Sequence, residues 1–511
     1  MAILNFISSV LATFEELNTL ISLVATHGQQ PLPLLGKWEQ RPGKETTLFE
    51  NMRAGRYSND EQAAGDLYEG SPPDKRYAML KARLWQKLLN HLFFLDFTDK
   101  GQSICYCQQE CLNMLHYSKM LRLKGEFGLA EKQAVKAVGM AKQGEYSALV
   151  VQGLEMLQFL YAQNHQPKNY QLVMEELTHY RQLSQWEIEA NDLYLNTRLL
   201  YNKSIKKRRD SLKELPTIVM QLEVLWKKAS SIAIFERYNK LKTWYLEMIN
   251  DFEAVLEHTK EVESLMKEGK LNLLIYDHTF NVYIHLYACL RMKRYEEGMQ
   301  FAETHLDVFE RTSHNWFGFM EIYLLMAIHA QQYPLANQLF QQVDKNRLFC
   351  KLMEFAKEKW TLYRAYIAWV EPMSQLRENL DYASLIQSIP QMTKDKLGFN
   401  VATLVLQFLH DLRTGDLDLL HCRMENLKQY TKRYLSDRHA QRSRLFFRLL
   451  ALVVTHQLEV EVCRKKGTRL LAQLRATPSP GDAFAEIEII PYEHLWERVL
   501  STLEQKEVKA I

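Results

Sequence analysis

Hydrophobic positions along this chain return at the spacing of amphipathic helices. In the segment that follows Asp74, apolar side chains recur every three or four residues: Tyr77, Leu80, Leu84, Leu88, Leu92 and Leu95. Steps of this size place side chains on one face of an α-helix. Between about residues 101 and 475, similar segments follow one another with only short polar breaks. The pattern therefore predicts a series of back-to-back helices and no sheet.

The stretch 57–97 carries the clearest helix boundaries. Ser58 and Glu61 have the spacing of a capping box, which predicts a short helix from about residue 59. Gly70 and the two prolines that follow it end this helix, and Asp74 can cap a second, longer one. A short helix, a turn and a longer helix resemble a helix-turn-helix in outline.

A sequence pattern recurs in the middle of the chain, in which a bulky residue is followed three positions later by a small one. It occurs as Phe127 with Ala130, Tyr295 with Gly298, and Tyr333 with Ala336. The last two copies begin 38 residues apart, from 295 to 333, and a unit of about 38–42 residues also fits the first copy. This period lies in the range of helical repeats, which stack into an elongated solenoid.

These pairs resemble those of the tetratricopeptide-like superfamily, which packs a small residue opening its second helix against a bulky residue in the preceding turn. The resemblance implies an all-α fold, an α-solenoid of stacked helical hairpins. The chain departs from the family pattern in the first helix of each unit, where Ser118, Leu286 and Leu324 replace the family's glycine. The repeat is therefore expected to be degenerate.

Three regions are expected from this organisation. Residues 1–100 form an N-terminal helical segment that contains the helix-turn-helix-like stretch, and residues 101–475 form the degenerate helical-repeat solenoid. Residues 476–511 provide a linker and a C-terminal capping helix that begins at Pro491. A solenoid needs such a helix to cover its last open layer.

The amino-acid composition supports the helical prediction and indicates in which cellular environment the protein is expected. Gly 19 and Pro 13 together make about 6 % of the 511 residues, against an average of roughly 12 %. The formal net charge of +3 imposes neither nucleic-acid nor membrane binding. No apolar run approaches the ~18 residues of a membrane helix, so we expect a soluble protein without membrane insertion. Seven loosely spaced cysteines indicate reduced thiols and a cytoplasmic location.

Sequence signatures of catalysis are missing. The chain has no nucleophile elbow, no zinc-protease helix and no dinucleotide-binding loop. Cys105 and Cys107 point about 200° apart on a helix, so they cannot share a metal ion there. His278 and His285 share a helix face, either as a half-buried polar stripe or as part of a ligand groove. We therefore expect no metal, no cofactor and no enzymatic activity, with an unfamiliar catalytic site as the alternative.

Two basic features could contact nucleic acid. Arg76, Arg83 and Lys87 lie within about 40° of one another on the long helix, where they could meet phosphates and base edges or simply form a solvated helix edge. A basic cluster could neutralise several phosphates or another anion, or form a solvated corner between helices. Its residues are Lys203, Lys206, Lys207, Arg208 and Arg209.

The sequence favours binding over chemistry. We expect a helical-repeat scaffold or regulatory protein whose concave face, rich in aromatic side chains, holds a protein or peptide partner. The alternative is a DNA-binding transcriptional regulator, with stretch 57–97 as the reader and the repeats as the sensor. The partner, the pathway and the oligomeric state are not determined by the sequence.

Overall fold

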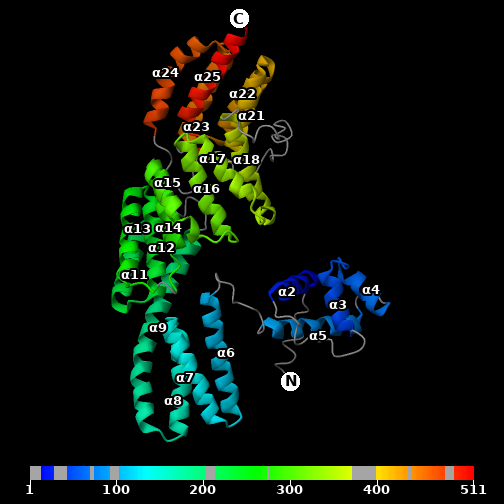
Figure 1. Ribbon diagram of the computed structural model, residues 1–511, viewed down its shortest axis with the longest axis vertical. Coiled ribbons are helices and arrows are strands. Elements are labelled where there is room, and N and C mark those ends of the chain that lie inside the picture. Colours follow the sequence, from blue (N-terminus) through cyan, green and yellow to red (C-terminus); the bar gives the residue numbers. More distant parts are fainter. Residues whose placement is uncertain are drawn as a thin grey trace. The chain divides into compact units, whose positions relative to one another are not determined.

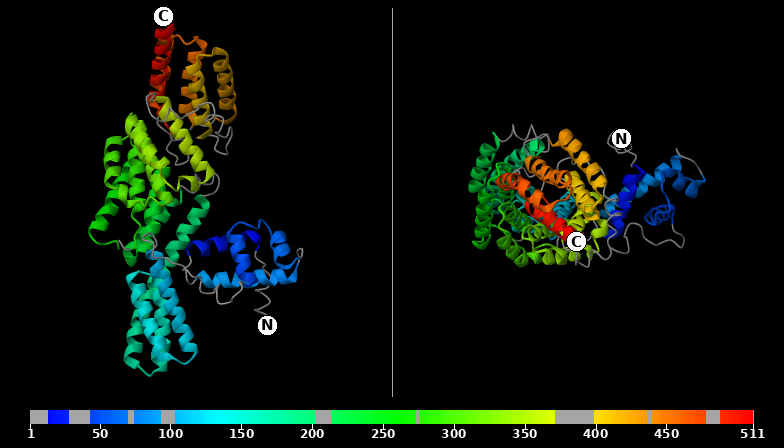
Figure 2. Two further views of the ribbon diagram at one scale, coloured as in Figure 1. Left: turned by 45° about the vertical axis from the view of Figure 1, so that its right-hand side comes forward. Right: turned by 90° about the horizontal axis from the view of Figure 1, so that it is seen from above.

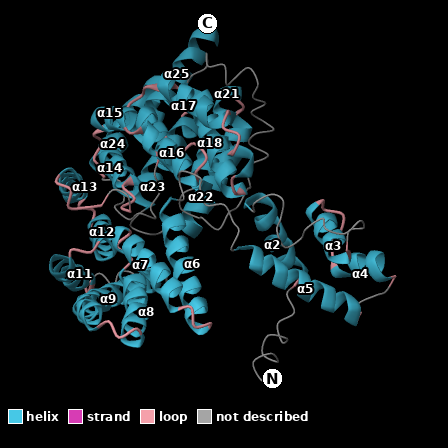
Figure 3. Cartoon of the chain, turned by 60° about the horizontal axis from the view of Figure 1, so that its bottom comes forward, coloured by secondary structure: helices cyan, strands magenta, loops and turns pink. Residues whose placement is uncertain are grey.

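All regular secondary structure in the described part of the chain is helical. The computed structural model describes residues 13–27, 43–69, 74–92, 103–201, 213–272, 275–370, 399–435, 440–477 and 488–510. In these ranges 84 % of the residues are helical, in 21 α-helices and two short 3₁₀ helices, and there is no strand (Figure 3). The all-α prediction is confirmed, and the contacts between successive helices are consistent with a helical solenoid.

Two compact units divide the chain, Met1–Tyr180 and Arg181–Ile511. The helices that begin in the first unit are α2 (Phe14–His27), α3 (Lys44–Arg53), α4 (Asp60–Tyr68), α5 (Lys75–His91), α6 (Ser103–Leu123), α7 (Phe127–Gln143), α8 (Ser147–Gln163) and α9 (Pro167–Tyr201) (Figure 1). Helix α9 continues into the second unit. Helices α2–α5 enclose one hydrophobic core, and α6–α8 enclose another with the start of α9.

The caps of α4 and α5 show where local sequence signals hold and where they shift. Asp74 caps α5 as predicted, because its side chain accepts a hydrogen bond from the backbone N–H of Arg76. The predicted capping box of α4 is wrong by one position. Asn59 is the N-cap and accepts from the N–H of Gln62, whose side chain in turn accepts from the N–H of Ser58. An asparagine caps as well as a serine, so the neighbouring residue takes the role.

Helices α6, α7 and α8 run side by side, joined by short turns of one geometry (Figures 1 and 2). In the α7–α8 turn, Glu145 adopts a left-handed conformation, and the N–H of Tyr146 donates to the carbonyl of Ala141. This bond pattern satisfies the last carbonyls of a helix and reverses the chain. The same turn recurs around Gly125, His165, Asn250, Lys293 and Gln331. From α6 to α9 its left-handed residues stand 20 residues apart, at 125, 145 and 165.

The second unit continues as antiparallel helices. They are α11 (Leu215–Ala229), α12 (Ile232–Met248), α13 (Phe252–Lys267), α14 (Thr279–Arg291), α15 (Tyr295–Thr304), η3 (Leu306–Val308), α16 (His314–His329), α17 (Tyr333–Asp344), η4 (Phe349–Lys351), α18 (Glu354–Val370), α21 (Phe399–Thr414), α22 (Leu417–Tyr434), α23 (Gln441–Thr455), α24 (Val460–Ala476) and α25 (Tyr492–Ala510). Helix α16 is the most enclosed of them, with 11 of its 16 residues buried.

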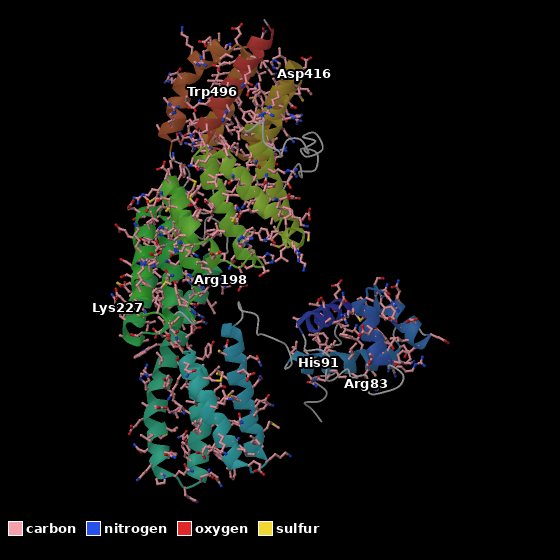
Figure 4. All side chains as sticks on the ribbon, viewed as in Figure 1. Arg83, His91, Arg198, Lys227, Asp416 and Trp496 are labelled. Carbon is pink, nitrogen blue, oxygen red and sulfur yellow. The ribbon has the colours of Figure 1, made fainter. Side chains whose placement is uncertain are left out.

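Helix α25 packs against α23 and α24 at the end of the second unit (Figure 4). Trp496 of α25 is only 1 % exposed, and its ring fills the space above Gly467 of α24. A Cβ atom at position 467 would lie 2.9 Å from Cζ2 of Trp496, so this contact requires glycine. The C-terminal helix thus covers apolar surface that α23 and α24 would otherwise expose.

Candidate functional site

A groove on α7, α8 and α9 is the clearest candidate binding surface of the first unit. It has a volume of about 360 Å³ and an apolar floor made by Val138, Leu154, Leu157 and Tyr161. Tyr161 is the one aromatic side chain among the residues that line it. The lining of the groove is therefore mostly aliphatic.

Close packing of α7 against α8 forms the floor of the groove. Gly153 of α8 faces Val138 of α7, and a Cβ atom at position 153 would lie 2.4 Å from Cγ2 of Val138. Only glycine permits this approach, which fixes where the two helices cross. Val150 and Leu154, on the same helix, are buried on either side of the crossing.

The rims of the groove leave apolar surface in contact with solvent. Val135 of α7 is 50 % exposed and Leu172 of α9 is 62 % exposed. Beside Val135, Gly139 leaves a gap, because no heavy atom lies within 4 Å of a Cβ added there. Lys142 of α7 and Glu176 of α9 form an ion pair across one end, with 2.7 Å between Nζ and Oε2. The groove thus has an apolar floor with an ion pair at one end, an arrangement that suits an amphipathic helix.

The small residues of the recurring sequence pattern, Ala130, Gly298 and Ala336, are all buried. Ala130 and Ala336 are fully buried, and Gly298 lies so close to α14 and α16 that a Cβ there would meet Sδ of Met326 at 2.4 Å. Of the bulky partners, Tyr333 is buried, while Phe127 and Tyr295 are half-buried. Each small residue stands where two helices approach closely.

The three basic residues of α5 are engaged by acidic residues of their own bundle. Arg83 and Lys87 share one partner, Glu45 of α3, with 3.2 Å between Nε of Arg83 and Oε1 of Glu45. Arg76 pairs with Asp74, with 2.7 Å between Nη2 and Oδ2. Figure 4 shows the position of Arg83. All three remain at least 44 % exposed. A phosphate would have to compete with these carboxylates. In the helix-turn-helix-like stretch, residues 70–73, which hold the predicted glycine and proline break, and residues 93–97 lie outside the described residues, as does the basic cluster 203–209.

His278, just before α14, and His285, inside it, occupy different environments. His285 is 4 % exposed, its Nδ1 lies 2.8 Å from Oγ1 of Thr259, and its ring stacks on Phe301. Burial lowers the pKa of His285 to about 4. His278 is the half-buried N-cap residue of the same helix. His285 is thus a packed core residue, and the two rings do not form a joint ligand site.

Sequence reasoning missed a buried polar cluster around Arg442 of α23. All five guanidinium N–H groups of Arg442 donate hydrogen bonds. Nε and Nη2 bind the two carboxylate oxygens of Glu488, Nη2 also binds Glu493, and Nη1 binds the carbonyls of Leu474 and Thr477. The cluster ties the start of α23 to the end of α24 and the start of α25.

One signal in the sequence pointed to this cluster. Arg442 stands three and four positions before Leu445 and Phe446, which places it on the buried stripe of α23. A charged residue on such a stripe requires a partner, because an unpaired buried charge is strongly unfavourable. The identity of the partner was not readable from the sequence.

Further observations bear on the class of the protein. Among the described residues, no helix is both long and apolar enough to cross a membrane, and no group of three or more His, Cys, Asp or Glu side chains could hold a metal ion. No protein-family model, no curated protein and no solved structure matches the chain.

Proposed function

We propose that this protein is a non-enzymatic helical-repeat scaffold that binds an amphipathic helical segment of a partner protein in the groove on α7, α8 and α9. The observation that carries the proposal is the exposure of Val135 and Leu172 on either side of an apolar floor. Isolated exposed apolar side chains are common, but exposed apolar side chains on both rims of an apolar groove are typical of binding sites. The partner helix would place apolar residues at positions i, i+3, i+4 and i+7 into the groove.

Tetratricopeptide-like packing is part of the proposal. Ser118 of α6 occupies the position of the family's glycine, and its Oγ donates to the carbonyl of Ala130 at 2.8 Å with both residues fully buried. A small residue on each helix therefore supports the close crossing that the family uses. The six cysteines with described side chains are free thiols, which supports the cytoplasmic location that we propose.

Site-specific crosslinking in the native cells tests the proposal. A photoreactive amino acid replaces Leu172 in the groove or Leu199 outside it. Both are leucines of α9 with similar exposure, 62 % and 65 %. We expect position 172 alone to capture a partner, through a segment with helical amphipathic spacing. Equal capture at both positions, or capture through a segment without that spacing, would contradict the proposal.

Two glycines of α7 provide a matched test once the partner is known. Gly139 lines the groove and Gly128 does not, and a Cβ atom at either position meets nothing within 4 Å. Gly139→Leu should fill the groove and abolish binding, whereas Gly128→Leu should leave binding unchanged. Both variants should keep or raise the melting temperature, because leucine favours a helix over glycine by about 1 kcal/mol. Retained binding by Gly139→Leu would exclude this groove.

A further inference from the structure

A polar cavity in the second unit lies where two helix-hairpin turns meet the Arg442 cluster. Its volume is about 340 Å³, within the roughly 300–1,000 Å³ of small-ligand pockets. Lys293 and Gln331, the left-handed residues of the α14–α15 and α16–α17 turns, both line it, together with residues of α23, α24 and α25. Four basic side chains, three acidic side chains and two histidines face this cavity.

The acidic groups of the cavity already accept hydrogen bonds from arginines. Glu488 and Glu493 bind Arg442, and Glu497 accepts from Arg475 with 3.1 Å between Oε1 and Nη2. A ligand that donates hydrogen bonds would have to displace these pairs. The carboxylates therefore shape the cavity and leave little capacity for a cationic ligand.

Both ring nitrogens of His329 also interact with other groups of the protein. Its Nε2 donates to the backbone carbonyl of Glu488 at 2.6 Å, and its Nδ1 lies 3.5 Å from the hydroxyl of Tyr295. Burial lowers the pKa of His329 to about 4, so the ring is neutral near pH 7. This histidine holds the segment before α25 in place and does not offer a free N–H to the cavity.

Two lining groups keep unused hydrogen-bonding capacity. Nδ1 of His494 is buried without a hydrogen-bond partner, although such groups are nearly always satisfied in folded proteins. Lys293 forms no ion pair with any described residue, and it is close enough to His494 and Glu493 to influence their protonation. These two groups thus offer a cation and an imidazole with unused hydrogen-bonding capacity, and Arg291 is a further basic residue of the lining.

We propose that this cavity binds a small organic anion, whose carboxylate or phosphate group accepts hydrogen bonds from Lys293 and His494. An oxyanion matches the groups that remain unsatisfied, and the four basic side chains outnumber the three acidic ones. The anion arrives either as a free small molecule or as the terminal carboxylate of a peptide. The site is separate from the groove on α7, α8 and α9, so either proposal can fail without the other.

Calorimetric titration of the full-length protein tests the site with four probes. These are inorganic phosphate, citrate, alanyl-alanine and alanyl-alanine amide. We expect saturable one-to-one binding of at least one oxyanion and none of the amide. Binding of phosphate or citrate identifies a free anion, and binding of alanyl-alanine alone identifies a chain end. If no probe binds at millimolar concentrations, the proposal is wrong.

Substitutions locate the bound anion. Lys293→Met should weaken binding at least about tenfold, because it removes a charge-assisted hydrogen bond. Lys345→Met, at an exposed lysine after α17 that does not line the cavity, should leave binding unchanged. His494→Phe preserves the ring and removes its nitrogens, so it provides a second variant if Lys293→Met does not fold. Unchanged affinity in a folded variant of either Lys293 or His494 would overturn the assignment.

Discussion

Arg442 and Glu488 form a bidentate ion pair almost without contact with solvent, with side chains that are 5 % and 9 % exposed. Nη2 of Arg442 lies 3.0 Å from Oε2 of Glu488, and Nε binds the other carboxylate oxygen. The N–H of Tyr492 also donates to Glu488, at 2.9 Å. Because Glu488 lies shortly before α25 and binds the N–H of its first residue, this pair fixes the start of the C-terminal helix against α23.

Removal of Arg442 should therefore destabilise the second unit severely. Arg442→Met leaves Glu488 and Glu493 buried without their cation, and breaking a buried pair in this way costs about 3–5 kcal/mol. Arg464→Met is the matched control, since Arg464 forms exposed pairs worth about 0–1 kcal/mol. Urea unfolding of both variants measures the difference. Equal stability of the two variants would show that breaking the buried pairs of Arg442 costs no more than breaking the exposed pairs of Arg464.

The stability of the protein should fall between about pH 6.5 and about pH 4, with His285 as one cause. Burial, Lys260 and His305 lower the pKa of folded His285 from 6.5 to about 4. The unfolded chain therefore binds more protons in this range, so the free energy of unfolding decreases as the pH falls. The full shift corresponds to roughly 3 kcal/mol, fully present above pH 6.5. Urea unfolding at a series of pH values should show a flatter profile for His285→Gln than for His421→Gln, at an exposed position. Parallel profiles would rule out this contribution.

A charge at Ala336 should be tolerated poorly. Ala336→Asp places a carboxylate at a fully buried position of α17, at a cost of roughly 3 kcal/mol or more. Gln338→Asp introduces the same side chain at an exposed position of the same helix and should have little effect. Thermal unfolding followed by circular dichroism distinguishes them. A melting temperature of Ala336→Asp within a degree or two of the control would mean that α17 can rotate this position to solvent.

Duplex DNA should bind weakly and without sequence preference, with a Kd in the range of roughly 10⁻⁴–10⁻⁶ M at physiological salt. Glu45 partly neutralises Arg83 and Lys87, so Glu45→Gln should strengthen this nonspecific binding. Reversing the charges of Lys206 and Arg208 should weaken it and flatten its salt dependence. Fluorescence anisotropy at several salt concentrations measures both effects. Sub-micromolar, sequence-selective binding that is lost in Arg83→Gln/Lys87→Gln would favour the DNA-binding regulator instead.

The sequence determines local structure well and long-range contacts poorly. Four of the six positions predicted for the apolar stripe of α5 are buried, because a helical period depends only on neighbours in sequence. They are Tyr77, Leu80, Leu84 and Leu88, whereas Leu92 is half-buried and Leu95 lies outside the described residues. The Arg442 cluster was not predicted, since its acidic partners lie 46 and 51 residues further along the chain. Their proximity depends on how α24 and α25 fold back.

The groove on α7, α8 and α9 was equally inaccessible from the sequence. Its floor depends on the crossing of Gly153 with Val138, and a glycine inside a helix does not reveal which neighbour it approaches. The expectation of an aromatic concave face followed from composition. Composition counts side chains without placing them, so it could not indicate that the residues lining this groove are mostly valine and leucine.

The burial of α16 has a consequence for production of the protein in pieces. Seven consecutive residues of this helix, Ile322–Ile328, are buried by neighbours that include α14, α15 and α17. Of these neighbours α17 follows α16 in the chain, so until the ribosome has released α17 the nascent chain presents part of this apolar segment uncovered, which invites aggregation or chaperone binding. Fragments of the second unit that end between α16 and α17 should accumulate in inclusion bodies, whereas fragments that end after α13 should not.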